Sequence, residues 1–183
     1  VDISALPEQV VSDVVMSAFN SAGQRCSALR VLFLQNEIAP RVIELLKGSM
    51  QELRIGDPAL LSTDVGPVID RKALGLLEEH VGKMAETGKI IHQCKVPEAS
   101  AHGTFLAPVV VEIDDIGVLG KEVFGPVLHI VRYKASDLDK VLESIRNTGF
   151  GLTLGVHSRI DGMARYVNRR VQVGNVYVNR NMV

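Results

Sequence analysis

The chain has almost no charge excess and very little cysteine. Its 20 Lys and Arg residues nearly balance its 21 Asp and Glu residues, which gives a formal net charge of −1. A surface that binds nucleic acid or an anionic membrane needs a basic excess or a basic run, and the sequence has neither. Two cysteines, Cys26 and Cys94, cannot build the disulfide framework of a small secreted domain. We therefore expect both thiols to be free and the protein to be cytoplasmic.

Long apolar runs and metal-ligand patterns are missing as well. No stretch approaches the roughly 20 apolar residues of a membrane-spanning helix, and no positively charged leader with a cleavage site opens the sequence. There is no C-x-x-C pair, and the histidines lack paired ligand spacing, so we expect no metal site. We expect the five histidines to lie at the surface or at element edges: His80, His92, His102, His129 and His157.

The hydrophobic pattern alternates between two periods. At 183 residues a single domain is the default, and we expect residues 1–183 to form it. Apolar residues recur with helical spacing in the segments 7–21, 38–50, 70–86, 137–147 and 162–170. Short apolar runs of strand length lie at 29–34, 89–92, 106–111, 127–133, 152–157 and 173–178. This alternation predicts an α/β fold with a mainly parallel sheet flanked by helices.

Cys26 lies in the most informative segment, Phe-Asn-Ser-Ala-Gly-Gln-Arg-Cys-Ser-Ala-Leu-Arg over residues 19–30. This segment joins an apolar helical run to a strand-like run. A cysteine at such a junction can have its thiolate stabilised by backbone N–H groups and a neighbouring cation, here Arg25. A lone free cysteine is more often a small buried hydrophobe. A second motif far along the chain, Lys-Glu-Val-Phe-Gly-Pro-Val over 121–127, favours the functional interpretation.

Together the two segments resemble the aldehyde dehydrogenase superfamily. In that family a Gly-Gln-x-Cys segment carries the nucleophile, and a Glu-x-Phe-Gly-Pro segment closes over the nicotinamide end of NAD(P). Further segments resemble the family in the same order, at residues 56–58, 66–67, 103–108, 147–152 and 174–179. Within the superfamily, residues 6–11, 21–30 and 178–181 most closely resemble the 1-pyrroline-5-carboxylate dehydrogenase half of the bacterial proline utilization A family.

The resemblance implies a role for each of five side chains. Cys26 would be the catalytic nucleophile, Glu122 would bind the hydroxyls of the nicotinamide ribose, and Phe124 would pack on the nicotinamide. Ser27 resembles the serine that binds the substrate's α-carboxylate. Arg25 is expected to join Ser27 in substrate binding, and its charge could also favour the Cys26 thiolate. Structural alternatives stay open at this point: a helix-capping hydroxyl for Ser27, a surface cation for Arg25, a solvated carboxylate for Glu122 and a core aromatic for Phe124.

The resemblance also implies a reaction and its cofactor. The expected reaction is NAD-dependent oxidation of L-glutamate γ-semialdehyde to L-glutamate in proline catabolism, through a cysteine thiohemiacetal and a thioester. NAD is the expected cofactor, with NADP open, and FAD is expected only if the parent also carries a proline dehydrogenase domain. The expected partners are the aldehyde, the rest of the parent chain and further copies in a homo-oligomer.

No G-x-G-x-x-G dinucleotide fingerprint is present. In the family, the NAD(P)-binding domain, the Glu general base and the oxyanion-hole Asn lie mostly before the nucleophile, and the aldehyde-anchoring loop would follow Asn181. We therefore expect an isolated catalytic domain without the NAD-binding domain or the anchor loop, inactive by itself. Three alternatives remain: a CoA-acylating or other aldehyde dehydrogenase, a non-catalytic domain that keeps the fold, and a Cys–His hydrolase, which needs a histidine within reach of Cys26.

Overall fold

Helices and strands alternate along the computed structural model, which describes residues 1–182. The helices are α1 (Pro7–Phe19), α2 (Ala39–Gln51), α3 (Arg71–Thr87), α4 (Leu138–Asn147) and α5 (Asp161–Asn168). The strands are β1 (Val31–Gln35), β2 (Lys89–Gln93), β3 (Val109–Glu112), β4 (Val127–Tyr133), β5 (Thr153–Val156) and β6 (Asn175–Val178). The predicted α/β class is confirmed. The strand predicted from residue 106 begins only at Val109, after Pro108, which has no N–H to donate to a ladder.

The main sheet has the strand order β1-β4-β3-β2. β1, β4 and β3 are parallel, with Val31 and Val111 both opposite His129, while β2 is antiparallel to β3. β5 and β6 form a separate parallel pair. The sheet is therefore mainly parallel, as predicted, but its strands are divided between two ladders.

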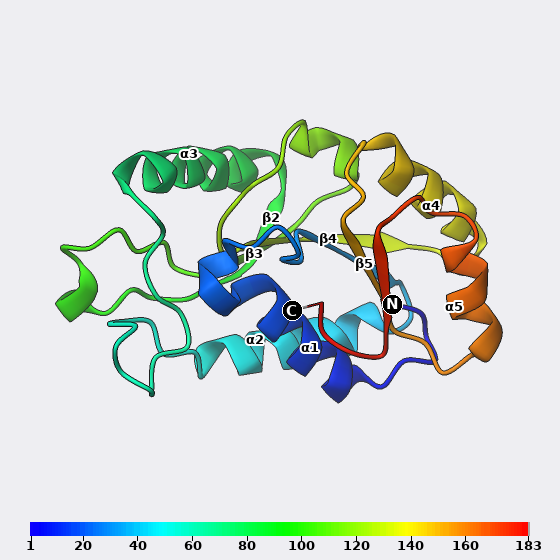
Figure 1. Cartoon of the computed structure of the whole chain (residues 1–183), viewed down its shortest axis with the longest axis horizontal. Helices are drawn as coiled ribbons and strands as arrows, with labels where there is room; N and C mark the ends of the chain where they lie inside the picture. The colour runs from blue at the N-terminus through cyan, green and yellow to red at the C-terminus, as the bar shows by residue number, and fades with distance from the viewer. Residues whose placement is uncertain (183) are drawn as a thin grey trace.

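The core lies on both faces of the main sheet. Figure 1 shows α3 along one side of the sheet and α1 and α2 along the other. A parallel strand covered on both faces reads as a continuous apolar run, and β4 follows this rule, with Val127, Leu128 and Ile130 wholly buried. A smaller cluster around Leu142 and Val156 packs the β5–β6 pair against its helices.

His129 contradicts the prediction that the histidines lie at the surface or at element edges, whereas His157 lies at an element edge, directly after β5. His129, in the middle of β4, has no exposed surface, and His157 is also buried. A buried imidazole needs partners for its ring nitrogens. In His129, Nδ1 lies 3.0 Å from the backbone oxygen of Arg30, and Nε2 lies 2.8 Å from Nε2 of His80. The prediction was wrong for His129 because its partners come from segments distant in sequence.

The first two residues lie between the two sheets. The amino group of Val1 donates to the Phe33 carbonyl of β1 at 3.0 Å, and the Asp2 N–H donates to the His157 carbonyl, just after β5, at 3.2 Å. Beyond them a cavity of about 770 Å³ extends between β1 and β5. No helix within residues 1–182 is both long and apolar enough to cross a membrane.

Candidate active site

The loop that carries Cys26 has an unusual backbone path. After α1 the chain turns through residues 20–23, where Ser21, Ala22 and Gly23 have φ values of 54°, 51° and 63°. Gly23 lies so close to Gly125 that a Cβ atom would overlap the Gly125 carbonyl. Only glycine combines this conformation with this approach, which explains the glycine of the Gly-Gln-x-Cys segment. Cys26 follows in the loop and is exposed.

Gln24, the next residue of the motif, attaches the loop to a second segment. Its side-chain nitrogen donates to the Pro67 carbonyl at 3.3 Å, and its side-chain oxygen accepts from the Ile69 N–H at 2.7 Å. A side-chain amide can donate and accept at once, so this residue type fits the position. The sequence pattern Gly-Gln therefore has a structural cause: one residue permits close approach and the other holds the loop.

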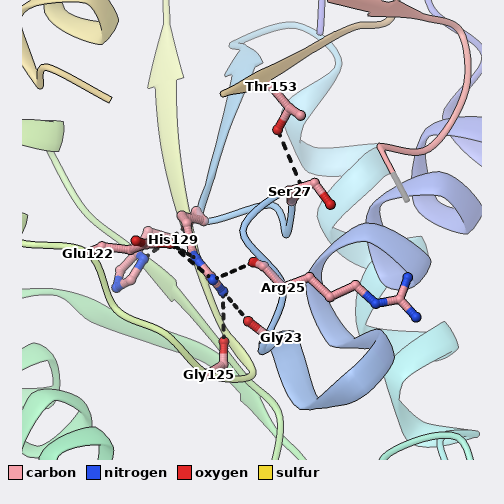
Figure 2. A network of polar contacts seen from close by, with 8 residues as sticks. Gly23, Arg25, Ser27, Glu122, Gly125, His129 and Thr153 are labelled. Atoms are coloured by element: carbon pink, nitrogen blue, oxygen red, sulfur yellow. Dashed lines mark hydrogen bonds and ion pairs between the residues drawn. The ribbon is translucent and has the colours of Figure 1, made fainter. Parts of the chain in front are cut away.

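Arg30 joins the Cys26 loop to the second motif. Its guanidinium donates to the carbonyls of Gly23 and Arg25, the latter at 3.0 Å. The same group pairs with Glu122 at 3.2 Å and lies 4.7 Å from the centre of the Phe124 ring. Figure 2 shows Gly23, Glu122, Gly125 and the Arg25 backbone gathered around these contacts. One side chain thus connects two motifs that are far apart in sequence.

The other residues singled out from the sequence lie around this cluster. Figure 2 shows the Arg25 side chain directed away from Glu122, and its Nε donates to the Ser21 hydroxyl at 2.9 Å. The Ser27 carbonyl accepts from the Thr153 hydroxyl of β5 at 3.4 Å. Phe124 is 44% exposed, so it is not a core aromatic. Cys26 and Glu122 line the same cavity between β1 and β5.

Arg30 was not identified from the sequence. The arginine adjacent to Cys26 drew attention because it is next in sequence, whereas Arg30 marks only the approach to β1. Burial lowers the pKa of the Arg30 guanidinium, while Glu122, and less strongly Cys26, raise it. A partly buried cation needs compensating acceptors, and the carbonyls and carboxylate around Arg30 supply them.

The surroundings of Cys94 and His129 bear on two points: how Cys94 differs from Cys26, and whether a histidine could activate Cys26. Cys94 is half-buried, its thiol donates to the Met50 carbonyl at 3.3 Å, and burial raises its pKa to about 11. Burial lowers the pKa of His129 to about 4. Both ring nitrogens of His129 are engaged by other partners, and within residues 1–182 no histidine hydrogen-bonds to Cys26. The Cys–His hydrolase therefore finds no support.

Comparison with known proteins identifies relatives of two kinds, PutA proteins and 1-pyrroline-5-carboxylate dehydrogenases. The chain is 53% identical over 189 residues to the bifunctional protein PutA of Klebsiella aerogenes, covering 100% of this chain and 14% of that protein. It is 34% identical to the 1-pyrroline-5-carboxylate dehydrogenase of Geobacillus kaustophilus (strain HTA426), covering 98% of this chain and 35% of that protein. The chain thus spans 14% to 35% of the length of these relatives.

Solved structures agree in fold. A crystal structure of bifunctional proline utilization A matches with a TM-score of 0.94 at 53% identity, over 98% of this chain and 18% of that one. A 1-pyrroline-5-carboxylate dehydrogenase from Thermus with bound NAD matches with a TM-score of 0.90 at 31% identity, over 100% of this chain and 35% of that one. The sequence model of the aldehyde dehydrogenase family matches residues 1–183. With the motifs, the fold and the whole-length match in agreement, the chain belongs to the aldehyde dehydrogenase family.

Proposed function

We propose that the chain is the catalytic domain of a longer NAD-dependent dehydrogenase that oxidises L-glutamate γ-semialdehyde to L-glutamate in proline catabolism. The main support is that Cys26 and Glu122 line one cavity and that Arg30 joins their two segments. The names of the relatives, PutA and 1-pyrroline-5-carboxylate dehydrogenase, support the substrate. A homo-oligomer is part of the proposal, and FAD belongs to it only for a parent with a proline dehydrogenase half.

The residues around the cavity fit a dinucleotide cofactor. The Glu122 side chain is 38% exposed, and Arg30 contacts its Oε1 oxygen. A carboxylate is acceptor-only and suits the vicinal hydroxyls of a ribose. Phe124, two residues after Glu122, does not line the cavity, but as a residue it is 44% exposed, which leaves part of its ring accessible to a flat partner. Glu122 would therefore hold the nicotinamide ribose and Phe124 the nicotinamide, and a Thermus relative solved with NAD supports this choice of cofactor.

The proposed chemistry begins at Cys26. Its thiolate forms a C–S bond with the aldehyde carbon, and the carbonyl π electrons move to oxygen to give the oxyanion of a thiohemiacetal. The Cys26 backbone N–H is the local donor available to that oxygen. NAD, when bound, supplies the hydride acceptor that takes this carbon to the thioester level. Water then hydrolyses the thioester to the carboxylate and frees the thiol; the general base for this step would come from another part of the longer protein.

Substrate selection is proposed to involve Ser27. Its backbone oxygen accepts a hydrogen bond from the Thr153 hydroxyl at 3.4 Å. This bond links the backbone of the residue next to Cys26 to β5. A serine hydroxyl can donate one hydrogen bond to a carboxylate. The resemblance assigns this hydroxyl to the α-carboxylate of the semialdehyde. Arg25 stays a proposed contributor to the substrate's surroundings, although its side chain contacts Ser21 in this structure.

The proposal is tested in the full-length protein by replacing each cysteine separately. Cys26→Ser should lower the rate of NADH formation from glutamate semialdehyde by about three orders of magnitude or more, as loss of a catalytic nucleophile does. Cys94→Ala is the matched control and should leave the rate within about twofold, because this thiol is half-buried and bonded to Met50. Turnover by Cys26→Ser close to that of the unmodified protein would refute the assignment.

A further inference from the structure

We propose that Arg30 is a positioning residue that fastens the nucleophile loop to the cofactor-binding segment, so that one side chain sets both NAD affinity and the placement of Cys26. This inference rests on the proposed function and deepens it. Arg30 is placed to do this because its side chain is only 15% exposed and lies between the two segments. It is the last residue of the segment 19–30 and lies outside the Gly-Gln-x-Cys pattern within that segment.

On the loop side, Arg30 holds two carbonyls that precede Cys26. Its Nη1 donates to the Gly23 oxygen, and its Nη2 donates to the Arg25 oxygen at 3.0 Å. The guanidinium is planar, with its donors in a fixed fork. Two carbonyls bound to one rigid fork cannot move independently, so the contacts fix the curvature of the loop immediately before the nucleophile. A single-point donor would hold only one of them.

On the cofactor side, Arg30 holds Glu122 by one oxygen. Its Nε and Nη2 both lie 3.2 Å from Oε1. No hydrogen bond to Oε2 occurs among residues 1–182, so this second oxygen is the one available to ribose hydroxyls. Arg30 also contacts the Gly125 carbonyl at 3.4 Å and the face of Phe124. The cation therefore sets the orientation of the carboxylate and of the aromatic ring together.

The backbone of Arg30 is bound by His129 of β4. The His129 backbone N–H donates to the Arg30 oxygen at 3.0 Å, and Nδ1 of the same residue lies 3.0 Å from that oxygen. His129 is wholly buried and is bonded on its other side to His80 of α3. The backbone of Arg30 is thus fixed by the core of the domain. This support distinguishes Arg30 from a surface arginine that pairs with a nearby carboxylate by chance.

The test uses the full-length protein and four variants: Arg30→Gln, Arg30→Lys, Glu122→Gln and the control Arg132→Gln. Arg132 pairs with Glu112 at 2.6 Å on β4 and β3 and does not line the cavity. The dissociation constant of NAD is measured by calorimetry without substrate. The reactivity of Cys26 is measured as its alkylation rate with and without saturating NAD, and kcat is measured at saturating NAD. Thermal unfolding reports whether each variant is folded.

Arg30→Gln should weaken NAD binding by about tenfold to a hundredfold, the range for loss of a charge-assisted hydrogen bond. It should also lower kcat at saturating NAD and change the Cys26 alkylation rate, which a loss of cofactor contacts alone would not do. Arg30→Lys keeps the charge but loses the fork, so it should restore NAD affinity in part and leave kcat low. Arg132→Gln should match the unmodified protein within about twofold in all readouts.

The outcomes separate this inference from the proposed function. If Glu122→Gln weakens NAD binding while both Arg30 variants bind NAD and turn over normally, Arg30 is not a positioning residue and the proposed function stands. If a folded Arg30 variant changes NAD affinity but neither kcat nor Cys26 alkylation, the coupling between the segments is refuted. If the unmodified protein binds no NAD, the proposed function fails and this inference fails with it.

Discussion

Cys94 should react with iodoacetamide far more slowly than Cys26, and burial of Cys94 accounts for a large part of this slowing. The thiolate is the reactive form of cysteine. Burial raises the pKa of Cys94 to about 11, so at pH 8 only about one molecule in a thousand carries this thiolate. An accessible thiol of ordinary pKa is about one quarter thiolate at the same pH. Ionisation alone therefore slows Cys94 by about two orders of magnitude relative to such a thiol.

Access adds to this difference, because Cys26 is exposed whereas Cys94 is half-buried and bonded to Met50. The assay is brief alkylation at pH 8, followed by digestion and quantification of both cysteine peptides by mass spectrometry. A parallel sample unfolded in urea is the control, and there the two peptides should label at similar rates. Equal labelling in the folded protein, or preferential labelling of Cys94, would refute the reasoning.

Two further predictions concern pH and substrate choice. Burial lowers the pKa of His129 to about 4, whereas an unfolded histidine titrates near 6.5. Between these two pH values the unfolded state binds more protons than the folded state. The contribution of His129 to the free energy of unfolding is therefore fully present above about pH 6.5 and falls by about 3 kcal/mol as the pH drops to about 4. Urea unfolding of the protein and of His129→Gln across this range should give a shallower pH dependence for the variant, and equal slopes would contradict the assignment. In the full-length protein, Ser27→Ala should lower kcat/KM for glutamate semialdehyde more than for an aldehyde without an α-carboxylate, by about tenfold. Equal losses for both aldehydes would mean that Ser27 is structural.

The order of elements could be predicted from the sequence because hydrophobic periodicity is a local property. All the predicted helices and strands are present, with bounds shifted by a few residues. The separate pairing of β5 with β6 was not predictable, because pairing depends on contacts between distant segments. The burial of His129 also depends on contacts between distant segments. It lies in the predicted strand 127–133, but its partners are His80 of α3 and Arg30 of the loop before β1.

The candidate site was predictable only in part, for the same reason. Cys26 and Glu122 were selected through a family resemblance, and spacing along the chain gave no indication that their segments meet. Arg30 ends the segment 19–30 but was assigned no role from the sequence. Its proposed role comes from its contacts with the carbonyls of Gly23 and Arg25 and with Glu122. For Arg25 the sequence left open a functional cation beside Cys26 and a surface cation, and in the structure its side chain contacts Ser21 and is directed away from Glu122. Adjacency in sequence is a poor guide to side-chain direction in a loop.

The placement of residues 1–2 between β1 and the end of β5 has a practical consequence for protein engineering. The Asp2 N–H donates to the His157 carbonyl at 3.2 Å, so this short segment forms part of the joint between the two sheets. A proline at position 2 would remove that N–H and leave the His157 carbonyl without this donor. Such a substitution should therefore lower the melting temperature, whereas a proline introduced into an exposed loop of compatible backbone conformation should not.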